Sequence, residues 1–257
     1  MKRLATALVL VPVVVWVVLF APDWALLAAV AIVGLLAFQE FDHIAAENEI
    51  PRPGWPGVAA GLVLMLAPEP LIVAVLVALA GMLIALRVPD LRLAMAASSA
   101  FVLGVLYIFG AWRCAIELHA LNRHWLMFAL LLSWAGDTAA MYAGKAFGRH
   151  PLAPRVSPSK TWEGAIASVI GGVLAGFLYA RYFLPSAPIG LVLPLAAAGN
   201  IAGQVGDLAE SAMKRGAGVK DSGSSLPGHG GWLDRIDSTL FAVPVVYALL
   251  KFLTLVI

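Results

Sequence analysis

The feature that constrains this chain most is a succession of apolar runs, separated by short stretches with Pro, Gly or charged residues. A helix needs about 20 predominantly apolar residues to cross a bilayer. The composition agrees, because 61% of the residues are apolar and 12% are charged, whereas soluble domains average about 45–50% and about 25%. We expect an all-α polytopic membrane protein with about nine transmembrane helices. They lie near residues 4–21, 24–41, 57–67, 71–86, 93–110, 125–146, 161–184, 188–213 and 238–257.

The distribution of Lys and Arg predicts how these segments are oriented. If the N-terminus is cytoplasmic, all but four of the 17 Lys and Arg residues fall on the cytoplasmic side, as the positive-inside rule requires. The exceptions are Arg113, Arg123, Arg181 and Lys251. The expected topology is therefore N-in/C-out. The run 57–67 is short, and a re-entrant helix is the alternative there, although it would spoil this asymmetry.

We expect a single integral membrane domain over residues 1–257. Its N-terminal run resembles a signal peptide, but the exit after Phe20 lacks a convincing cleavage site, which predicts an uncleaved span. Residues 1–124 are expected to be lipid-facing and structural, because charge is concentrated in the second half, which we expect to be catalytic. The one cysteine, Cys114, excludes an intrachain disulfide.

Polar residues recur along one face of the eighth expected span. Asn200, Gln204, Asp207, Ser211 and Lys214 are spaced by four, three, four and three positions, which aligns them on a helix. A carboxylate within a spanning helix costs at least about 2.5 kcal/mol. This stripe should therefore face a water-filled cavity or a partner charge.

An isolated carboxylate occurs in the sixth span as well. Asp137 has Ser133 one turn before it, and intramembrane acids of this kind are commonly functional. The alternative is structural, with buried ion pairs such as Asp207–Arg235 or Asp234–Lys214 that only hold the bundle together.

The segment Lys220–Trp232 is rich in glycine and precedes the last span. Four glycines and one proline within 223–231 predict a loop. Successive backbone N–H groups in such turns can hold phosphate oxygens, and glycine lets a backbone approach a ligand closely. Asp234 and Asp237, three residues apart, can face one metal ion. An ordinary polar turn is the alternative.

The connection before the seventh span carries basic residues. Ser157–Thr161 is expected to start a helix with Glu163 in its first turn, and a helix N-terminus near Lys160 would attract an anion. Within the span, small residues every four positions should let another helix backbone approach closely. They are Gly164, Ser168, Gly172 and Gly176.

Carboxylates, basic residues and a Gly-rich turn together suit polyphosphates bound with Mg²⁺, which takes one or two carboxylates plus substrate phosphates. The residues alone thus favour a membrane-embedded phospho- or nucleotidyl-transferase. A secondary transporter is the rival class, because it also has intramembrane acids and interrupted helices.

Two regions resemble the phosphatidate cytidylyltransferase (CDP-diacylglycerol synthase) family. The first runs from Ser211-Ala212-Met213-Lys214-Arg215 through Lys220-Asp221 and Pro227-Gly228-His229-Gly230-Gly231 to Asp234-Arg235-Ile236-Asp237. The second comprises Asp137-Thr138, Gly144, Gly148, Ser157-Pro158, Lys160-Thr161 and Glu163-Gly164. The family usually has an aromatic residue where Met141 stands, so neither Met141 nor Tyr142 is assigned a function.

The resemblance implies that CTP and phosphatidic acid give CDP-diacylglycerol and pyrophosphate, with Mg²⁺ as cofactor and a second cation left open. It implies a multi-pass protein of the bacterial inner (plasma) membrane whose active site faces the cytoplasm. The expected partners are CTP, phosphatidic acid, membrane lipid and a second copy of the chain in a homodimer, and no nucleic acid. The alternatives are a CTP-dependent polyprenol or lipid kinase and a secondary transporter.

The resemblance also assigns functions to individual residues. The expected catalytic residues are Lys214, Arg215, Lys220, Asp221, His229 and Arg235. The expected substrate-binding residues are Ser157, Lys160, Thr161, Glu163, Ser211, Gly228, Gly230 and Gly231. The expected metal ligands are Asp207, Asp234 and Asp237. Asp137 is expected to support a ligand without binding the metal itself.

Overall fold

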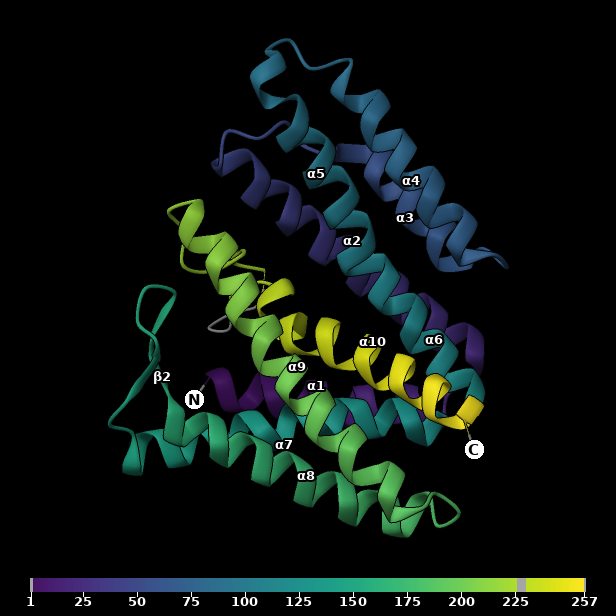
Figure 1. The fold of residues 1–257 in the computed structure, drawn as a ribbon, viewed down its shortest axis with the longest axis vertical. Helices are drawn as coiled ribbons and strands as arrows, with labels where there is room; N and C mark the ends of the chain where they lie inside the picture. Colours follow the sequence, from purple (N-terminus) through teal and green to yellow (C-terminus); the bar gives the residue numbers. More distant parts are fainter. Residues whose placement is uncertain (1, 226–229, 257) are drawn as a thin grey trace. The chain divides into compact units, whose positions relative to one another are not determined.

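The computed structural model describes residues 2–225 and 230–256, with side chains from residue 8 to 225 and from 230 to 253. Helices make up most of this part of the chain (Figure 1). They are α1 (Lys2–Leu19), α2 (Asp23–Glu47), α3 (Gly54–Leu66), α4 (Pro70–Ala85), η1 (Leu91–Leu93), α5 (Ala94–Gly104), η2 (Val105–Gly110), α6 (Ala111–Leu121), α7 (Arg123–Phe147), α8 (Trp162–Phe183), α9 (Ile189–Gly216) and α10 (Leu233–Val256). Strands β1 (Pro151–Ala153) and β2 (Ser157–Thr161) form an antiparallel hairpin.

The chain packs into two compact units. Unit 1 comprises Met1–Val13, Ala21–Arg113 and Met213–Arg235, and unit 2 comprises Val14–Phe20, Cys114–Ala212 and Ile236–Ile257. This division by packing does not test the expected functional halves 1–124 and 125–257. Each unit is described by itself below.

Unit 1 is built around aromatic side chains of α2, α5 and η2. Phe38, Phe101 and Phe109 are fully buried, and α3 lies directly against η2. A Cβ atom at Gly61 of α3 would lie 2.0 Å from a ring carbon of Phe109, so only glycine permits this approach. The packing that results fixes α2, which carries Glu40.

In unit 2, α7 and α8 lie side by side (Figure 1). The small residues of α8 make this possible, as the sequence predicted. A Cβ atom at Gly164 would lie 3.1 Å from the carbonyl oxygen of Ala140, and one at Gly176 would lie 2.7 Å from Leu132. The expected small-residue contact face is thus confirmed.

Glycines also bring α9 close to α10 within unit 2. A Cβ atom at Gly206 would lie 2.7 Å from the carbonyl oxygen of Asp237, and one at Gly199 would lie 2.7 Å from Val246. Unit 2 contains α10 from Ile236 onward. The close approach of α9 buries the first residues of this part, including Asp237 and Ser238.

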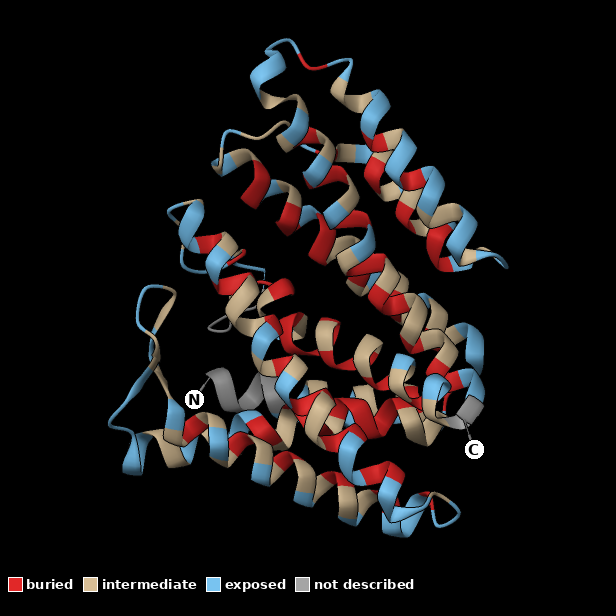
Figure 2. Ribbon diagram, in the orientation of Figure 1, coloured by how far each residue is buried: buried red, intermediate tan, exposed pale blue. Residues whose placement is uncertain are grey.

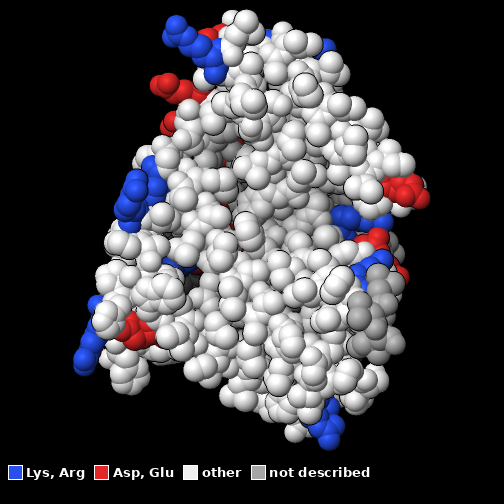
Figure 3. Space-filling view, viewed as in Figure 1, with Lys and Arg blue, Asp and Glu red and all other residues white. Residues whose placement is uncertain are grey.

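The outward surfaces of the helices are apolar. Many positions along α4 are exposed (Figure 2). The exposed side chains there include Leu71, Ile72, Leu79, Met82 and Leu83. The face drawn in Figure 3 carries few charged side chains. Apolar surface of this extent is unusual for a protein in water and is typical of helices that contact lipid.

The expectation of an all-α polytopic membrane protein is confirmed. Each of the nine expected segments lies on a helix, and six helical segments of the described chain are long and apolar enough to cross a membrane. Helix α3 has 13 residues, or about 20 Å at 1.5 Å per residue, which is shorter than the hydrocarbon core. The N-in/C-out orientation stays a prediction.

Two local expectations were wrong. Ser157–Thr161 forms strand β2, and α8 begins at Trp162 with Thr161 as its N-cap. The reason is that a residue before proline is driven to extended conformations, and Pro158 follows Ser157. The fifth expected span, 93–110, continues as helix to Leu121, because the polar residues of α6 end the apolar pattern without ending the helix.

Candidate active site

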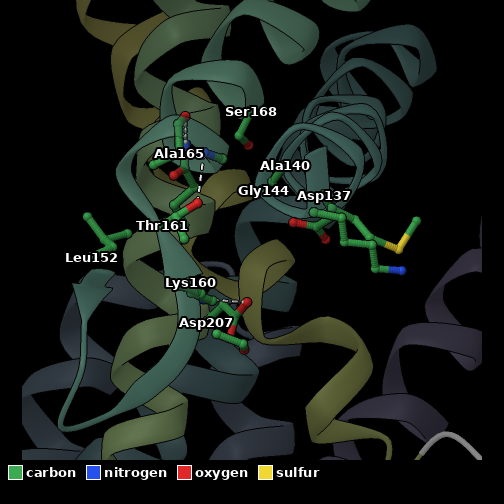
Figure 4. A pocket seen from close by; sticks show the side chains of 14 residues that line it. Asp137, Ala140, Gly144, Leu152, Lys160, Thr161, Ala165, Ser168 and Asp207 are labelled. Carbon is green, nitrogen blue, oxygen red and sulfur yellow. Dashed lines mark hydrogen bonds and ion pairs between the residues drawn. The ribbon is translucent and has the colours of Figure 1, made fainter. Parts of the chain in front are cut away.

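A cavity of about 390 Å³ opens in unit 2 beside the hairpin and the N-terminus of α8 (Figure 4). Charged side chains come from three elements, namely Asp137 and Lys145 of α7, Lys160 of β2 and Asp207 of α9. Small residues of α7 and α8, such as Ala140 and Gly164, complete the walls. The cavity therefore combines an apolar lining with a few converging charges.

Lys160 and Asp207 form an ion pair at the cavity. The Lys160 Nζ lies 2.6 Å from the Asp207 Oδ2, and their side chains are 26% and 32% exposed (Figure 4). Ser211, one turn further along α9, donates to the Asp207 Oδ1 over 3.4 Å. Because both charges remain accessible, the pair can open toward a charged ligand.

The polar face of α9 is confirmed and has defined partners. Asn200 donates to the carbonyl oxygen of Leu132 over 3.1 Å, and Gln204 donates to the Asn200 Oδ1 over 2.8 Å. Gln204 also reaches the carbonyl oxygen of Ala165 over 3.3 Å. These bonds fix α9 against α7 and α8, and thereby hold Asp207 at the cavity.

Acidic side chains surround the first turn of α10 in unit 2. Asp237 is buried, and its Oδ1 accepts from the backbone N–H of Ser238 over 2.7 Å. Asp137, Asp207 and Glu210 lie close enough to act electrostatically on Asp237. A group of carboxylates of this kind favours a nearby cation. Among the described residues, however, no three acidic, His or Cys side chains are arranged as a ready metal site.

Glu163 anchors the start of the hairpin instead of lining the cavity. Its Oε1 lies 2.6 Å from the His150 Nδ1, and its Oε2 accepts from the backbone N–H groups of Arg149 and His150. Ser157 pairs with Ala153 across the hairpin. Of the four expected substrate-binding residues in this region, Lys160 and Thr161 line the cavity.

The second group of expected site residues lies in unit 1. Lys214 of α9 forms an ion pair with the Oδ1 of Asp234 on α10, the alternative that the sequence left open for this carboxylate. Their side chains are 8% and 6% exposed. The Asp234 Oδ2 accepts from the backbone N–H groups of Gly231 over 2.7 Å and Ser222 over 2.9 Å. Asp234 therefore holds both ends of the Gly-rich segment.

Glycine is required at two positions of this segment for steric reasons. Gly230 has φ +79°, a backbone conformation that favours glycine, and its Cβ would lie 2.5 Å from the Asp234 Oδ2. A Cβ at Gly231 would lie 2.2 Å from the Glu40 Oε2. The glycines let the backbone close around carboxylates of the protein, where the sequence suggested a ligand.

The remaining basic residues among the expected site residues of unit 1 are accessible. Arg215, Lys220 and Arg235 are exposed, as is Asp221. Arg215 donates to the carbonyl oxygen of Val219 over 2.8 Å. The expected site residues Gly228 and His229 lie outside the described residues.

A family model for the cytidylyltransferase family matches residues 1–253 of the chain. The chain belongs to the cytidylyltransferase family. The family inferred from the sequence motifs is thus confirmed.

Similarity to individual cytidylyltransferases covers different shares of the chain. A phosphatidate cytidylyltransferase of Staphylococcus saprophyticus is 32% identical over 84% of this chain and 87% of its own length. Enzymes of the same name from Brucella suis and Thermotoga maritima are 47% and 43% identical over 48% and 49% of this chain. These two alignments span about half of each relative, 45% and 49%.

Sequence reasoning missed one residue of this chain that contacts the Gly-rich segment. Glu40 of α2 is 7% exposed and accepts hydrogen bonds from residues 222–233. A signal was present in the sequence, because Glu40 is a lone carboxylate in the apolar run 24–41, and such a charge is costly in a span without partners.

Proposed function

We propose that the chain transfers the cytidylyl group of CTP to phosphatidic acid, giving CDP-diacylglycerol and pyrophosphate in phospholipid biosynthesis. The observation that carries this proposal is the alignment with a named phosphatidate cytidylyltransferase over 84% of the chain and 87% of the relative. A cavity with both charged and apolar walls, in a protein of lipid-facing helices, suits a nucleotide and a lipid phosphate. Neither a polyprenol kinase nor a transporter is favoured by the relatives.

The chemistry requires positioning more than proton transfer. A phosphate monoester has a second pKa of about 6, so the lipid phosphate is largely ionised near neutral pH and needs no strong general base. One of its oxygens attacks the α-phosphorus of CTP, and the bond from that phosphorus to the bridging oxygen of the β-phosphate breaks. Pyrophosphate leaves with the electron pair. No covalent enzyme intermediate is required.

The residues at the cavity suit the two anions. Lys160, paired with Asp207 in the structure, would donate to a phosphate oxygen and offset the repulsion between substrates. Preorganised donors of this kind act mainly on charge that develops in the transition state. In unit 1, the exposed side chains of Arg215, Lys220 and Arg235 stay predicted contacts for phosphates.

We propose Mg²⁺ as the cofactor, held through Asp207. Its carboxylate is accessible at the cavity, Asp137 lines the same cavity, and the acidic group around Asp237 favours a cation. Mg²⁺ takes one or two carboxylates and completes its coordination with waters and phosphates. When bound, it would neutralise charge on the triphosphate. Asp237 is a further candidate ligand, whereas Asp234 would have to give up Lys214 to serve as one.

The assay that tests this function uses purified protein in detergent with radiolabelled CTP, phosphatidic acid and Mg²⁺. We expect a labelled lipid and equimolar pyrophosphate. Diacylglycerol with CTP serves as the control, because it lacks the attacking phosphate and should give no labelled lipid. Folded protein that produces no labelled lipid from phosphatidic acid would refute the proposal and revive the transporter alternative.

The proposed location is the inner membrane, with N-in/C-out topology, a cytoplasmic active site and a homodimeric assembly. In a variant without Cys114, a cysteine introduced by Ser224→Cys should react with an impermeant maleimide only after the cytoplasmic side is opened. Ser224 is exposed in unit 1, so labelling reports the side of the membrane. Labelling from the periplasmic side of intact cells would overturn this topology.

A further inference from the structure

Glu40 lies at the centre of a set of hydrogen bonds within unit 1. Its Oε1 accepts from the Ser225 hydroxyl and the Trp232 backbone N–H, both over 3.0 Å. Its Oε2 accepts from the Ser222 hydroxyl over 2.8 Å and the Leu233 backbone N–H over 2.9 Å. One carboxylate thus receives four donors from both sides of the Gly-rich segment.

Two of these donors belong to the start of α10, where the first N–H groups of a helix lack partners within the helix. The N-terminus of a helix also carries a partial positive charge. A buried carboxylate from α2 satisfies both needs, and its own burial is compensated by the four bonds. Glu40 therefore caps α10 from a helix about 190 residues away, as Trp232 and Glu40 are 192 positions apart.

The Gly-rich segment is shaped to close around this carboxylate. A Cβ at Gly223 would lie 2.8 Å from the Glu40 Oε1, and one at Gly231 would lie 2.2 Å from its Oε2. The Ser222 hydroxyl lies within hydrogen-bond distance of Glu40 and also of the Asp234 Oδ2, at 2.8 and 3.0 Å. Glu40 and the Lys214–Asp234 pair together fix the described ends of the segment.

We infer that Glu40 is a positioning residue for the reaction, which sets the backbone conformation in which residues 220–225 and 230–233 present their groups to CTP. This inference rests on the proposed function. Lys220 at the start of the segment and Arg235 in the first turn of α10 are exposed, so their positions depend on the backbone that Glu40 holds. Glu40 does not touch substrate and acts through this backbone.

Glu40→Gln tests whether the hydrogen bonds that Glu40 accepts matter, because it changes them without changing the size of the buried side chain. Glutamine has the same shape, but one of its two polar atoms is a donor. Whichever way the amide points, that donor faces either the Trp232 N–H or the Leu233 N–H, so one backbone bond is lost. Displacing reacting groups by about 1 Å can lower rates by about 100-fold. We expect kcat/KM for CTP to fall by roughly 10- to 100-fold, with KM for phosphatidic acid changed less than about threefold.

Asp42→Asn is the matched control on the same helix. The Asp42 Oδ1 accepts from the Gly54 N–H at the start of α3 over 2.7 Å, a single bond that an asparagine oxygen can keep. This variant removes a carboxylate charge from α2 without touching the Gly-rich segment, and its kinetics with CTP should stay near those of the wild type. Hydrogen exchange of the amides of 220–225 and 230–233 should accelerate in Glu40→Gln only.

The outcomes are separable. Normal CTP kinetics in a folded Glu40→Gln variant would overturn the inference, as would equal losses in Glu40→Gln and Asp42→Asn. If Glu40→Gln does not fold, Ser225→Ala removes one of the four donors at an exposed position and should raise KM for CTP about threefold. An unchanged KM for CTP in Ser225→Ala would also overturn the inference about Glu40. A wild-type protein without cytidylyltransferase activity would refute the proposed function and with it a positioning function in this reaction. An active wild-type protein with normal CTP kinetics in Glu40→Gln would refute the inference alone.

Discussion

Asp207→Asn is expected to lower turnover by roughly 1,000-fold or more while leaving thermal stability in detergent nearly unchanged. Loss of a ligand that helps a cation stabilise the transition state amounts to several kcal/mol, and about 1.4 kcal/mol corresponds to tenfold in rate. The fold should tolerate the change, because the Lys160–Asp207 pair is 26% and 32% exposed and accessible pairs contribute about 0–1 kcal/mol. Removing one charge also relieves repulsion on Asp237.

The measurement is the Mg²⁺ dependence of turnover, with the midpoint of thermal unfolding alongside it. Lys160→Met is the contrasting variant, since it breaks the same ion pair but removes no carboxylate. It should raise KM for a phosphate-bearing substrate and leave the Mg²⁺ titration where it is. An Asp207→Asn protein with near-normal activity and an unshifted Mg²⁺ titration would end the metal assignment for this residue.

Asp234→Asn is expected to destabilise unit 1, whereas Asp207→Asn should leave stability nearly unchanged. The Lys214–Asp234 pair is 8% and 6% exposed, and breaking one partner of a buried pair costs about 3–5 kcal/mol because the other charge stays buried without compensation. The Gly-rich segment should loosen as well, because Asp234 also accepts from Ser222 and Gly231. Chemical unfolding in mixed micelles measures the change in free energy.

Two further variants isolate the ion pair from other effects. The double variant Lys214→Met with Asp234→Asn should lose less stability than the sum of the single variants, because it leaves no lone buried charge. Glu47→Gln is the control, since the His43–Glu47 pair on α2 is exposed at 56% and 46% and should contribute less than about 1 kcal/mol. A stable Asp234→Asn protein with altered Mg²⁺ dependence would make Asp234 a metal ligand instead of a structural anchor.

Local and periodic properties were predictable from the sequence. The apolar runs predicted helices, because backbone groups in lipid must bond within the segment. The four-three spacing predicted the polar face of α9, and the glycine spacing predicted the close packing of α8 on α7. The motif spacing around 137–164 and 204–238 indicated the family. Each of these properties depends on residues near one another along the chain, so the pattern itself carries the information.

Only the tertiary structure decided which charges pair. Asp207 pairs with Lys160, whereas the sequence suggested Arg235 as its alternative partner. Asp234 pairs with Lys214, the alternative that the sequence named for it. The stretch 157–161 is a strand and not a helix start, because Pro158 favours an extended backbone at Ser157 and because residues 151–153 pair with it. Glu40 shows the reason most clearly. Its four donors lie more than 180 positions away, and no spacing rule relates residues whose contact exists only after α2 and the start of α10 have packed together.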